Sequence, residues 1–183
     1  MRTLKFHEQK LLKKVDFFNY PKENSIREVQ ILRRYHIQNR SDYDHYNRIV
    51  GSVTKLVNKL EQMPPTDSFR IKTTKTLLQK LFTMGVIQNT QSLLTAKNIT
   101  ASAFCRRRLP IIMVRLKMAT TPRIATQMIE HGHVRVGPDT ITDSAFLVPR
   151  HLEDLVTWVE TSKYRHHIAK YQSNFDDFEM SSL

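Results

Sequence analysis

Two prolines constrain the fold of residues 106–149 more than any other feature of this chain. Pro110 and Pro122 each stand where a short helix can begin, because the first turn of a helix does not use the amide hydrogen that proline lacks. Thr121 is kept extended by the proline that follows it and is predicted to cap the second helix. Gly132 supplies the left-handed residue on which that helix can end. The sequence therefore predicts two short helices joined by a turn.

The residues that follow alternate between polar and apolar, as a half-buried strand does. Residues 133–136 carry this alternation, residues 137–140 are predicted to form a turn, and residues 146–148 are predicted to form a second short strand. Apolar residues between positions 150 and 159 then recur at helical spacing and predict a last helix. We expect two short helices packed on a small antiparallel sheet, followed by a C-terminal helix.

The preceding residues 20–105 show helical rather than strand periodicity. Asp42 is a plausible cap for one long helix, Asp67 or Ser68 for the next, and Gly85 suits the end of the latter. The expected fold class is therefore α+β, a mostly helical N-terminal arm followed by the small module. The expected divisions are a basic extension over 1–19, a helical region over 20–105, the module over 106–149, and a C-terminal helix with an acidic tail over 150–183.

The charge balance indicates a polyanionic partner. The 29 Lys and Arg residues exceed the 17 Asp and Glu residues and give a formal net charge of +12. Cationic side chains favour phosphate backbones because they release condensed counterions. A single cysteine, Cys105, excludes an internal disulfide and a cysteine-based zinc cluster, as is usual in a reducing compartment. With a charged N-terminus and no apolar window near the roughly 18 residues that span a bilayer, we expect a soluble intracellular protein.

Catalytic motifs are absent from the sequence. It contains no Walker glycine loop, no zincin helix motif and no nucleophile elbow. His131 and His133 lack a third metal ligand at suitable spacing. Cys105 directly precedes three arginines, and positive charge beside a thiol can lower its pKa. The favoured interpretation is nevertheless that Cys105 is a small packing residue. We therefore expect no enzyme, no metal and no cofactor.

Basic side chains of the module are the candidate binding residues. Arg108 and Arg115 are seven positions apart and are expected to share a helix face turned away from the apolar residues. Arg123 falls in the first turn of the second helix, and Arg135 on the polar side of the predicted strand. If the helices pack on the sheet, these groups can converge on one cationic surface that suits phosphates. The alternative is a solvated basic face.

Trp158 is expected in the core, with base stacking as the lesser alternative.

The segment 106–136 resembles the S4 RNA-binding domain. The matching features run from Arg107-Arg108-Leu109 through Thr121-Pro122-Arg123 to the His-Gly-His-Val segment at 131–134, which is the most characteristic. Two positions depart from the family pattern: Lys117 stands where a small residue is frequent, and Gly137-Pro138-Asp139 replaces a common Val-Asn-Gly. The resemblance implies RNA contacts by eight residues, namely Arg107, Arg108, Arg115, Lys117, Arg123, His131, His133 and Arg135.

A weaker resemblance extends over most of the chain. Residues 27–67 and 77–87 resemble the helical arm of eukaryotic ribosomal S4 proteins, whereas residues 7–20 and 156–171 look more like the Imp family of the U3 small nucleolar ribonucleoprotein. This family resemblance implies a nucleolar assembly factor that promotes pairing of U3 small nucleolar RNA with pre-ribosomal RNA for small-subunit rRNA maturation. The implied partners are those two RNAs, a processome scaffold phosphoprotein and other processome proteins, with no membrane and no small-molecule substrate.

Two alternatives stay open at this point. One is a mature small-subunit ribosomal protein of the S4 family. The other is a protein-interaction scaffold whose contact with RNA is secondary, with the apolar residues near 152–159 and the tail at 175–178 as its contact surface. A steep dependence of binding on salt favours RNA as the main ligand.

Overall fold

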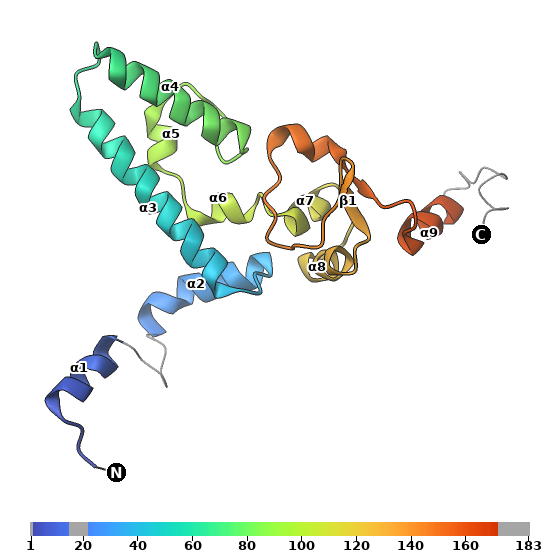
Figure 1. Ribbon diagram of the computed structural model, residues 1–183, viewed down its shortest axis with the longest axis horizontal. Coiled ribbons are helices and arrows are strands. Elements are labelled where there is room, and N and C mark those ends of the chain that lie inside the picture. Colours follow the sequence, from blue (N-terminus) through green and yellow to red (C-terminus); the bar gives the residue numbers. More distant parts are fainter. Residues whose placement is uncertain (1, 15–21, 172–183) are drawn as a thin grey trace. The chain divides into compact units, whose positions relative to one another are not determined.

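The computed structural model describes residues 2–14 and 22–171, and the chain divides into two units, residues 1–38 and residues 39–183 (Figure 1). The first unit contains helix α1 (Phe6–Lys14) and helix α2 (Lys22–Tyr35). The boundary expected near residue 19 and the acidic tail near residues 175–179 lie outside the described residues. The candidate site belongs wholly to the second unit.

The second unit begins with four helices. These are α3 (Arg40–Gln62), α4 (Ser68–Thr83), α5 (Leu93–Lys97) and α6 (Ala101–Cys105). Helix α5 lies between α3 and α4 (Figure 1), and α6 packs against α3. Their shared interior is apolar: Val57, Leu60, Leu78, Leu81, Ala96 and Phe104 are all buried. The ring of Tyr46 stacks on that of Phe104, with centroids 5.8 Å apart.

The ends of these helices follow the sequence signals in two places and depart from them in one. The side chain of Asp67 accepts a hydrogen bond from the amide of Phe69 and caps α4, and Gly85 adopts φ +74° after that helix ends. The expected cap of α3 is wrong. Asn39 is the N-cap, and Asp42 lies in the first turn, where its carboxylate instead accepts a hydrogen bond from Arg108.

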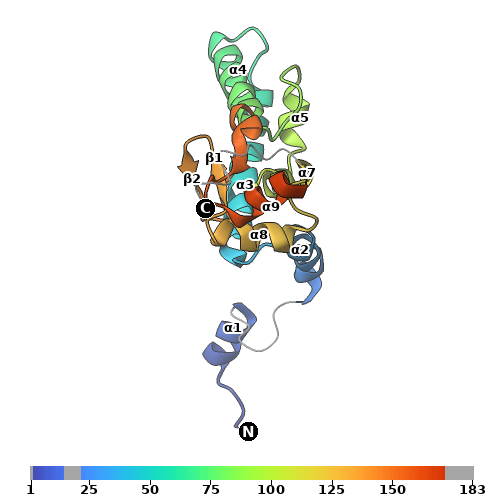
Figure 2. The same ribbon diagram turned by 90° about the vertical axis from the view of Figure 1, so that its right-hand side faces the viewer.

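The module that follows confirms the predicted pair of short helices. Helix α7 (Leu109–Arg115) and helix α8 (Pro122–Glu130) each have a proline at their start. Thr121 caps α8 by accepting from the amide of Ile124, and Gly132 has φ +71° after it. In Figure 2, α4 and α5 lie at one end of the second unit and α8 lies toward the other.

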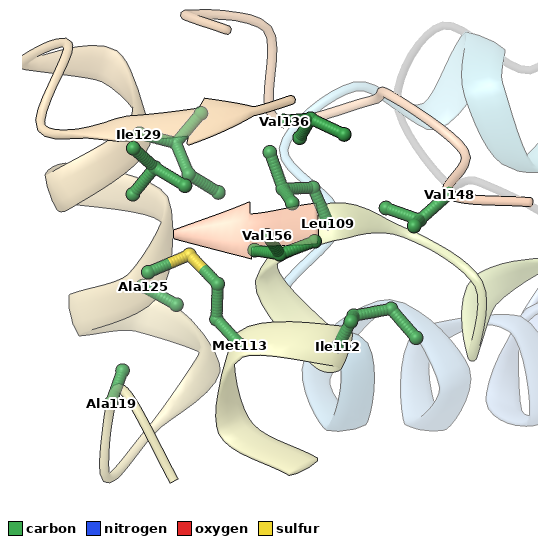
Figure 3. Packing of buried hydrophobic residues seen from close by; sticks show 10 residues of the cluster. Leu109, Ile112, Met113, Ala119, Ala125, Ile129, Val136, Val148 and Val156 are labelled. Atoms are coloured by element: carbon green, nitrogen blue, oxygen red, sulfur yellow. The ribbon is translucent and has the colours of Figure 1, made fainter. Parts of the chain in front are cut away.

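The sheet of the module has three short antiparallel strands in the order β2-β1-β3. These are β1 (Val134–Val136), β2 (Asp139–Thr140) and β3 (Val156–Trp158). Helices α7 and α8 pack on one face of this sheet (Figure 3), and ten buried residues form the core between them: Leu109, Ile112, Met113, Ala119, Ala125, Ile129, Val134, Val136, Val148 and Val156. The α+β fold class, with a helical region, a small two-helix-and-sheet module and a C-terminal helix, is confirmed.

Three local predictions for this module were wrong. Residues 139–140 do not belong to a turn alone, because they pair with β1. Residues 146–148 are not the second strand; Leu147 makes only an isolated bridge to Arg108. Residues 150–159 are not one helix but a 3₁₀ helix, η1 (Arg150–Leu155), followed by β3. Their apolar spacing suits a helix, but Val156 meets Val136 across the open edge of β1, and this tertiary pairing overrides the local pattern.

The C-terminal helix comes later than predicted. It is α9 (Lys163–Tyr171), which begins after the last strand. No helix within residues 2–14 and 22–171 combines the length and the apolar character that crossing a membrane requires.

Candidate nucleic-acid interface

The structure distributes the eight candidate residues over three places. Arg107 and Arg108 lie in the interior, where the helical region meets the module. Arg115, Lys117 and Arg123 lie at the turn that joins α7 to α8, and His131, His133 and Arg135 lie at the end of α8 and on β1. Each group has its own surroundings, and these decide what its side chains can bind.

Arg108 is an interior residue with only 2% of its surface exposed. Its Nη1 donates to Oδ2 of Asp42 at 2.8 Å and to the hydroxyl of Tyr46 at 3.2 Å. Burial alone lowers the pKa of Arg108, but its hydrogen bond to Asp42 and its interaction with Tyr46 outweigh burial, so the pKa is raised and the charge is kept. The prediction that Arg108 shares an outward helix face with Arg115 is wrong, because Arg108 precedes α7 and reaches toward α3.

Arg107 is also turned inward. Its Nε donates to the carbonyl of Val148 at 2.9 Å, and its Nη1 lies 2.9 Å from Oε2 of Glu153. Burial lowers the pKa of Arg107. The guanidinium packs directly on the backbone of Gly85, where a Cβ atom would stand 2.7 Å from Cζ. Glycine at this position therefore serves both the left-handed backbone and the close approach of Arg107.

A third arginine of this junction, Arg150, was missed by the sequence reasoning. Its Nη2 donates to the carbonyl of Ile87 at 2.7 Å, and its guanidinium carbon lies 4.0 Å from the centre of the Phe82 ring. Both partners precede it by more than 60 positions, so no local pattern distinguishes Arg150 from a solvated arginine. We call Arg107, Arg108 and Arg150 the junction arginines, because each of them ties the module or its 3₁₀ segment to another part of the unit.

The cations of the α7–α8 turn are exposed. The Arg115 side chain is 54% exposed and forms an ion pair with Glu153, the carboxylate that also pairs with Arg107. Burial, with repulsion from Arg107 and Arg150, lowers the pKa of Arg115. Lys117 and Arg123 are exposed, and neither makes an ion pair with any residue of the described ranges.

The backbone of Lys117 explains why a small residue is frequent at this position in the family. Lys117 has φ +61°, in the left-handed region that glycine occupies at least cost. A small residue is therefore the easier choice where the turn after α7 closes. A lysine there accepts backbone strain while presenting a long cationic side chain to solvent.

The third group lies on the other face of the sheet. Side chains of β1 alternate, so Val134 and Val136 enter the core with α7 and α8 while Arg135 faces away from it. Arg135 Nε donates to the Thr157 hydroxyl at 3.1 Å, and its Nη1 lies 3.2 Å from Glu160. Arg135 is therefore half-buried and paired with Glu160, and it lies on the face of the sheet opposite to the one that α7 and α8 cover.

The histidines join an aromatic cluster at this end of the sheet. The rings of His131 and His133 stack at 6.2 Å, and His133 meets Tyr164 of α9 edge-on at 4.9 Å. Tyr164 in turn stacks on Trp158 at 5.8 Å. Trp158 also packs against the core cluster, as the sequence predicted. The Ser162 hydroxyl lies 3.2 Å from Nδ1 of His133, which orients that ring.

Two further sequence interpretations concern chemistry. Cys105 is fully buried, and burial raises its pKa to about 11 although Arg108 acts in the opposite sense. Arg106 and Arg108 do lower the pKa of this thiol, but burial outweighs them, so the pKa is raised overall and Cys105 is a packing residue. Among the residues that the structure describes, no group of three His, Cys, Asp or Glu side chains is placed to hold a metal ion.

Comparison with known proteins places this architecture in a class. Residues 3–106 match the family model described as the ribosomal protein S4/S9 N-terminal domain, and residues 107–154 match the S4 domain. The chain therefore belongs to the ribosomal protein S4 family and carries an S4 domain.

Full-length relatives narrow the class further. The U3 small nucleolar ribonucleoprotein protein IMP3 of Saccharomyces cerevisiae is 52% identical over 182 residues, covering 99% of this chain and 100% of the relative. The human protein of the same name is 45% identical and covers 100% of both chains. A small ribosomal subunit protein uS4 from Hyperthermus butylicus is 32% identical over 78% of this chain and 80% of its own length. The chain belongs to the IMP3 family of U3 small nucleolar ribonucleoprotein proteins.

Proposed function

We propose that this protein is an RNA-binding assembly factor of the U3 small nucleolar ribonucleoprotein that promotes pairing of the U3 RNA with pre-ribosomal RNA. The observation that carries the proposal is the pair of exposed cations, Lys117 and Arg123, without ion-pair partners in the described ranges, on the α7–α8 turn of an S4 module. Full-length similarity to U3 ribonucleoprotein proteins supports the particular RNA. The proposed location is the nucleolus, and the proposed protein partners are a scaffold phosphoprotein and other proteins of the small-subunit processome.

The physical basis is the repulsion between two phosphate backbones. Pairing two RNA strands concentrates negative charge, and cations at the pairing site reduce that cost by replacing condensed counterions. The start of α8 at Pro122 and Arg123 adds the partial positive charge of a helix N-terminus. These contacts reach backbone and shape rather than base edges, which suits binding to structured RNA.

The eight candidate residues take different parts in this proposal. Lys117 and Arg123 contact phosphates directly, with Arg115 beside them after exchange of its ion pair with Glu153. Arg135, His131 and His133 form a second contact on the outer face of the sheet. Arg107 and Arg108 are positioning residues, because their guanidinium groups are already bound within the fold.

The test is annealing of short U3 and pre-ribosomal RNA strands, followed by fluorescence over a range of salt concentrations. The Lys117→Glu/Arg123→Glu variant reverses two exposed charges of the turn. A matched control, Arg48→Glu/Lys55→Glu, reverses one exposed arginine and one exposed lysine seven positions apart on α3. Arg115→Glu is avoided because it would place a second carboxylate against Glu153.

Faster or tighter pairing by the native protein and the α3 control, lost in the turn variant, supports the proposal. An equal loss of RNA pairing in both double variants would show that only the net charge of the protein matters, and it would overturn the assignment of the turn. An absence of any effect on pairing by the native protein would overturn the annealing function and favour a scaffold role.

A further inference from the structure

A polar cavity lies where the helical region meets the module, beside the junction arginines. Its volume is about 530 Å³, and its walls come from the loop after α4, from α5 and α6, and from the end of α7. Volumes of roughly 300–1,000 Å³ are usual for sites that bind small molecules. This cavity is distinct from the exposed turn between α7 and α8, and Arg115 is the residue that connects the two.

The charge of the cavity is one-sided. Three arginines line it, Arg106, Arg107 and Arg115, and no carboxylate is among the lining residues. Within the described ranges, Glu153 is the only carboxylate that forms an ion pair with these guanidinium groups, and Arg107 and Arg115 share it. Positive charge therefore remains in excess, and an anion entering the cavity would relieve the crowding of cations around Arg115.

Several lining groups have hydrogen-bonding capacity to spare. Arg106 is exposed, and its guanidinium donates no hydrogen bond to any residue in the described parts of the chain. The side-chain amides of Gln88, Asn89 and Asn98 also have no hydrogen-bond partner in those parts. An amide offers two donors and one acceptor, the same kinds of groups that lie along the edge of a nucleobase. The largely buried side chains of Ile87 and Ile99 lie in the wall next to these amides.

A cationic corner, an amide-lined wall and neighbouring apolar side chains together suit a nucleotide. We propose that this cavity binds one unpaired nucleotide of a single-stranded RNA segment, with its phosphate at Arg106 and Arg115 and its base edge at Gln88, Asn89 and Asn98. The inference rests on the proposed RNA-binding function. A strand of RNA is favoured over a free nucleotide because Arg115 is only two residues from Lys117, so a strand held at the α7–α8 turn can continue into the cavity.

The test compares two RNAs that differ only in unpaired nucleotides. One is a blunt duplex, and the other is the same duplex with a single-stranded extension that carries a fluorescent base analogue. The variants are Arg106→Ala, which removes an exposed cation, and Asn89→Asp, which puts a carboxylate into the wall. Arg48→Ala, an exposed arginine of α3 outside the cavity, is the matched control. Thermal unfolding of every variant confirms that it is folded.

Binding of the extended RNA should weaken roughly tenfold in either cavity variant, the size of one lost charge-assisted hydrogen bond, while the blunt duplex and the control change less than about twofold. Equal weakening for both RNAs would overturn the cavity assignment and leave the proposed function standing. Binding of neither RNA by the native protein would overturn the proposed function itself. Displacement of the analogue by adenosine monophosphate, at concentrations near the Kd of the extended RNA, would overturn the polymer assignment in favour of a free nucleotide.

Discussion

The junction arginines and the exposed cations of the α7–α8 turn have the same chemistry and opposite surroundings. Arg108 is 2% exposed and is held by Asp42 and Tyr46, whereas Arg123 is exposed and has no ion pair within the described ranges. A buried cation must be paired to be tolerated at all, so its binding capacity is used inside the fold. An exposed cation without a partner keeps that capacity for a ligand. Surroundings, not residue type, separate the two roles.

Arg115 stands between these two cases. Half of its side chain is exposed, yet it shares Glu153 with the buried Arg107. An exposed ion pair of this kind contributes little to stability and exchanges readily when a phosphate competes. Arg115 is therefore the residue through which the proposed RNA binding at the turn would act on the structure of the junction.

The largest expected effect is on the stability of the junction. Arg108→Ala removes a buried donor and leaves the Asp42 carboxylate and the Tyr46 hydroxyl without their partner. We expect the free energy of unfolding to fall by about 3–5 kcal/mol. Urea unfolding followed by circular dichroism measures it. A change under about 1 kcal/mol would mean that Arg108 is not held as described and would break the comparison with the turn cations.

Gly85→Ala should have the next largest effect, because it acts on the same junction through Arg107. The substitution strains a backbone with φ +74° and brings a Cβ atom to 2.7 Å from the Arg107 guanidinium carbon. We expect a loss of about 1–3 kcal/mol in unfolding free energy. The control is Gly51→Ala in the middle of α3, where nothing lies within 4 Å. That change should stabilise the protein by roughly 0.5–1 kcal/mol, and equal effects of both would contradict the assignment.

The buried thiol gives the junction a pH dependence of its own. The pKa of Cys105 is about 11 in the folded chain and lower when the chain unfolds, so the thiolate forms first in the unfolded state. The stability contribution is complete below the unfolded pKa of about 8.5, and it decreases as pH rises from there to about 11, by roughly 2–3 kcal/mol. Urea unfolding at pH 8 and pH 10.5 measures the decrease. Cys105→Ala should remove that part of it, and an unchanged slope would assign the effect to another group, such as Tyr46.

The smallest expected effect on stability belongs to the turn. Arg123→Ala should leave unfolding within about 0.5 kcal/mol of the native protein, because the side chain is exposed. It should instead lower the slope of RNA affinity against salt by about 0.7–0.9, the contribution of one phosphate contact. Fluorescence anisotropy at several salt concentrations measures that slope. A destabilised variant with an unchanged slope would place Arg123 with the junction arginines.

Much of the module was predictable from local signals. Pro110 and Pro122 marked the starts of α7 and α8, and Thr121 and Gly132 marked a cap and an end, because caps and left-handed residues act within a few positions of one another. The strand at β1 followed from its alternation. The helix expected over 150–159 failed since its spacing suited a helix while the open edge of β1 offered backbone partners that no local pattern reveals.

The sequence identified the cationic side chains of the module, but it did not show which of them are buried and which are exposed. The sequence determined that this chain is basic, that it carries an S4 pattern, and that arginines cluster around Leu109. Only the tertiary structure decided that Arg107 and Arg108 turn inward, that Arg150 joins them, and that Lys117 and Arg123 stay exposed. The physical reason is distance along the chain. Periodicity, capping and charge are properties of neighbours in sequence, whereas the burial and pairing of a cation depend on Asp42, Ile87 and Glu153, which only folding brings to it.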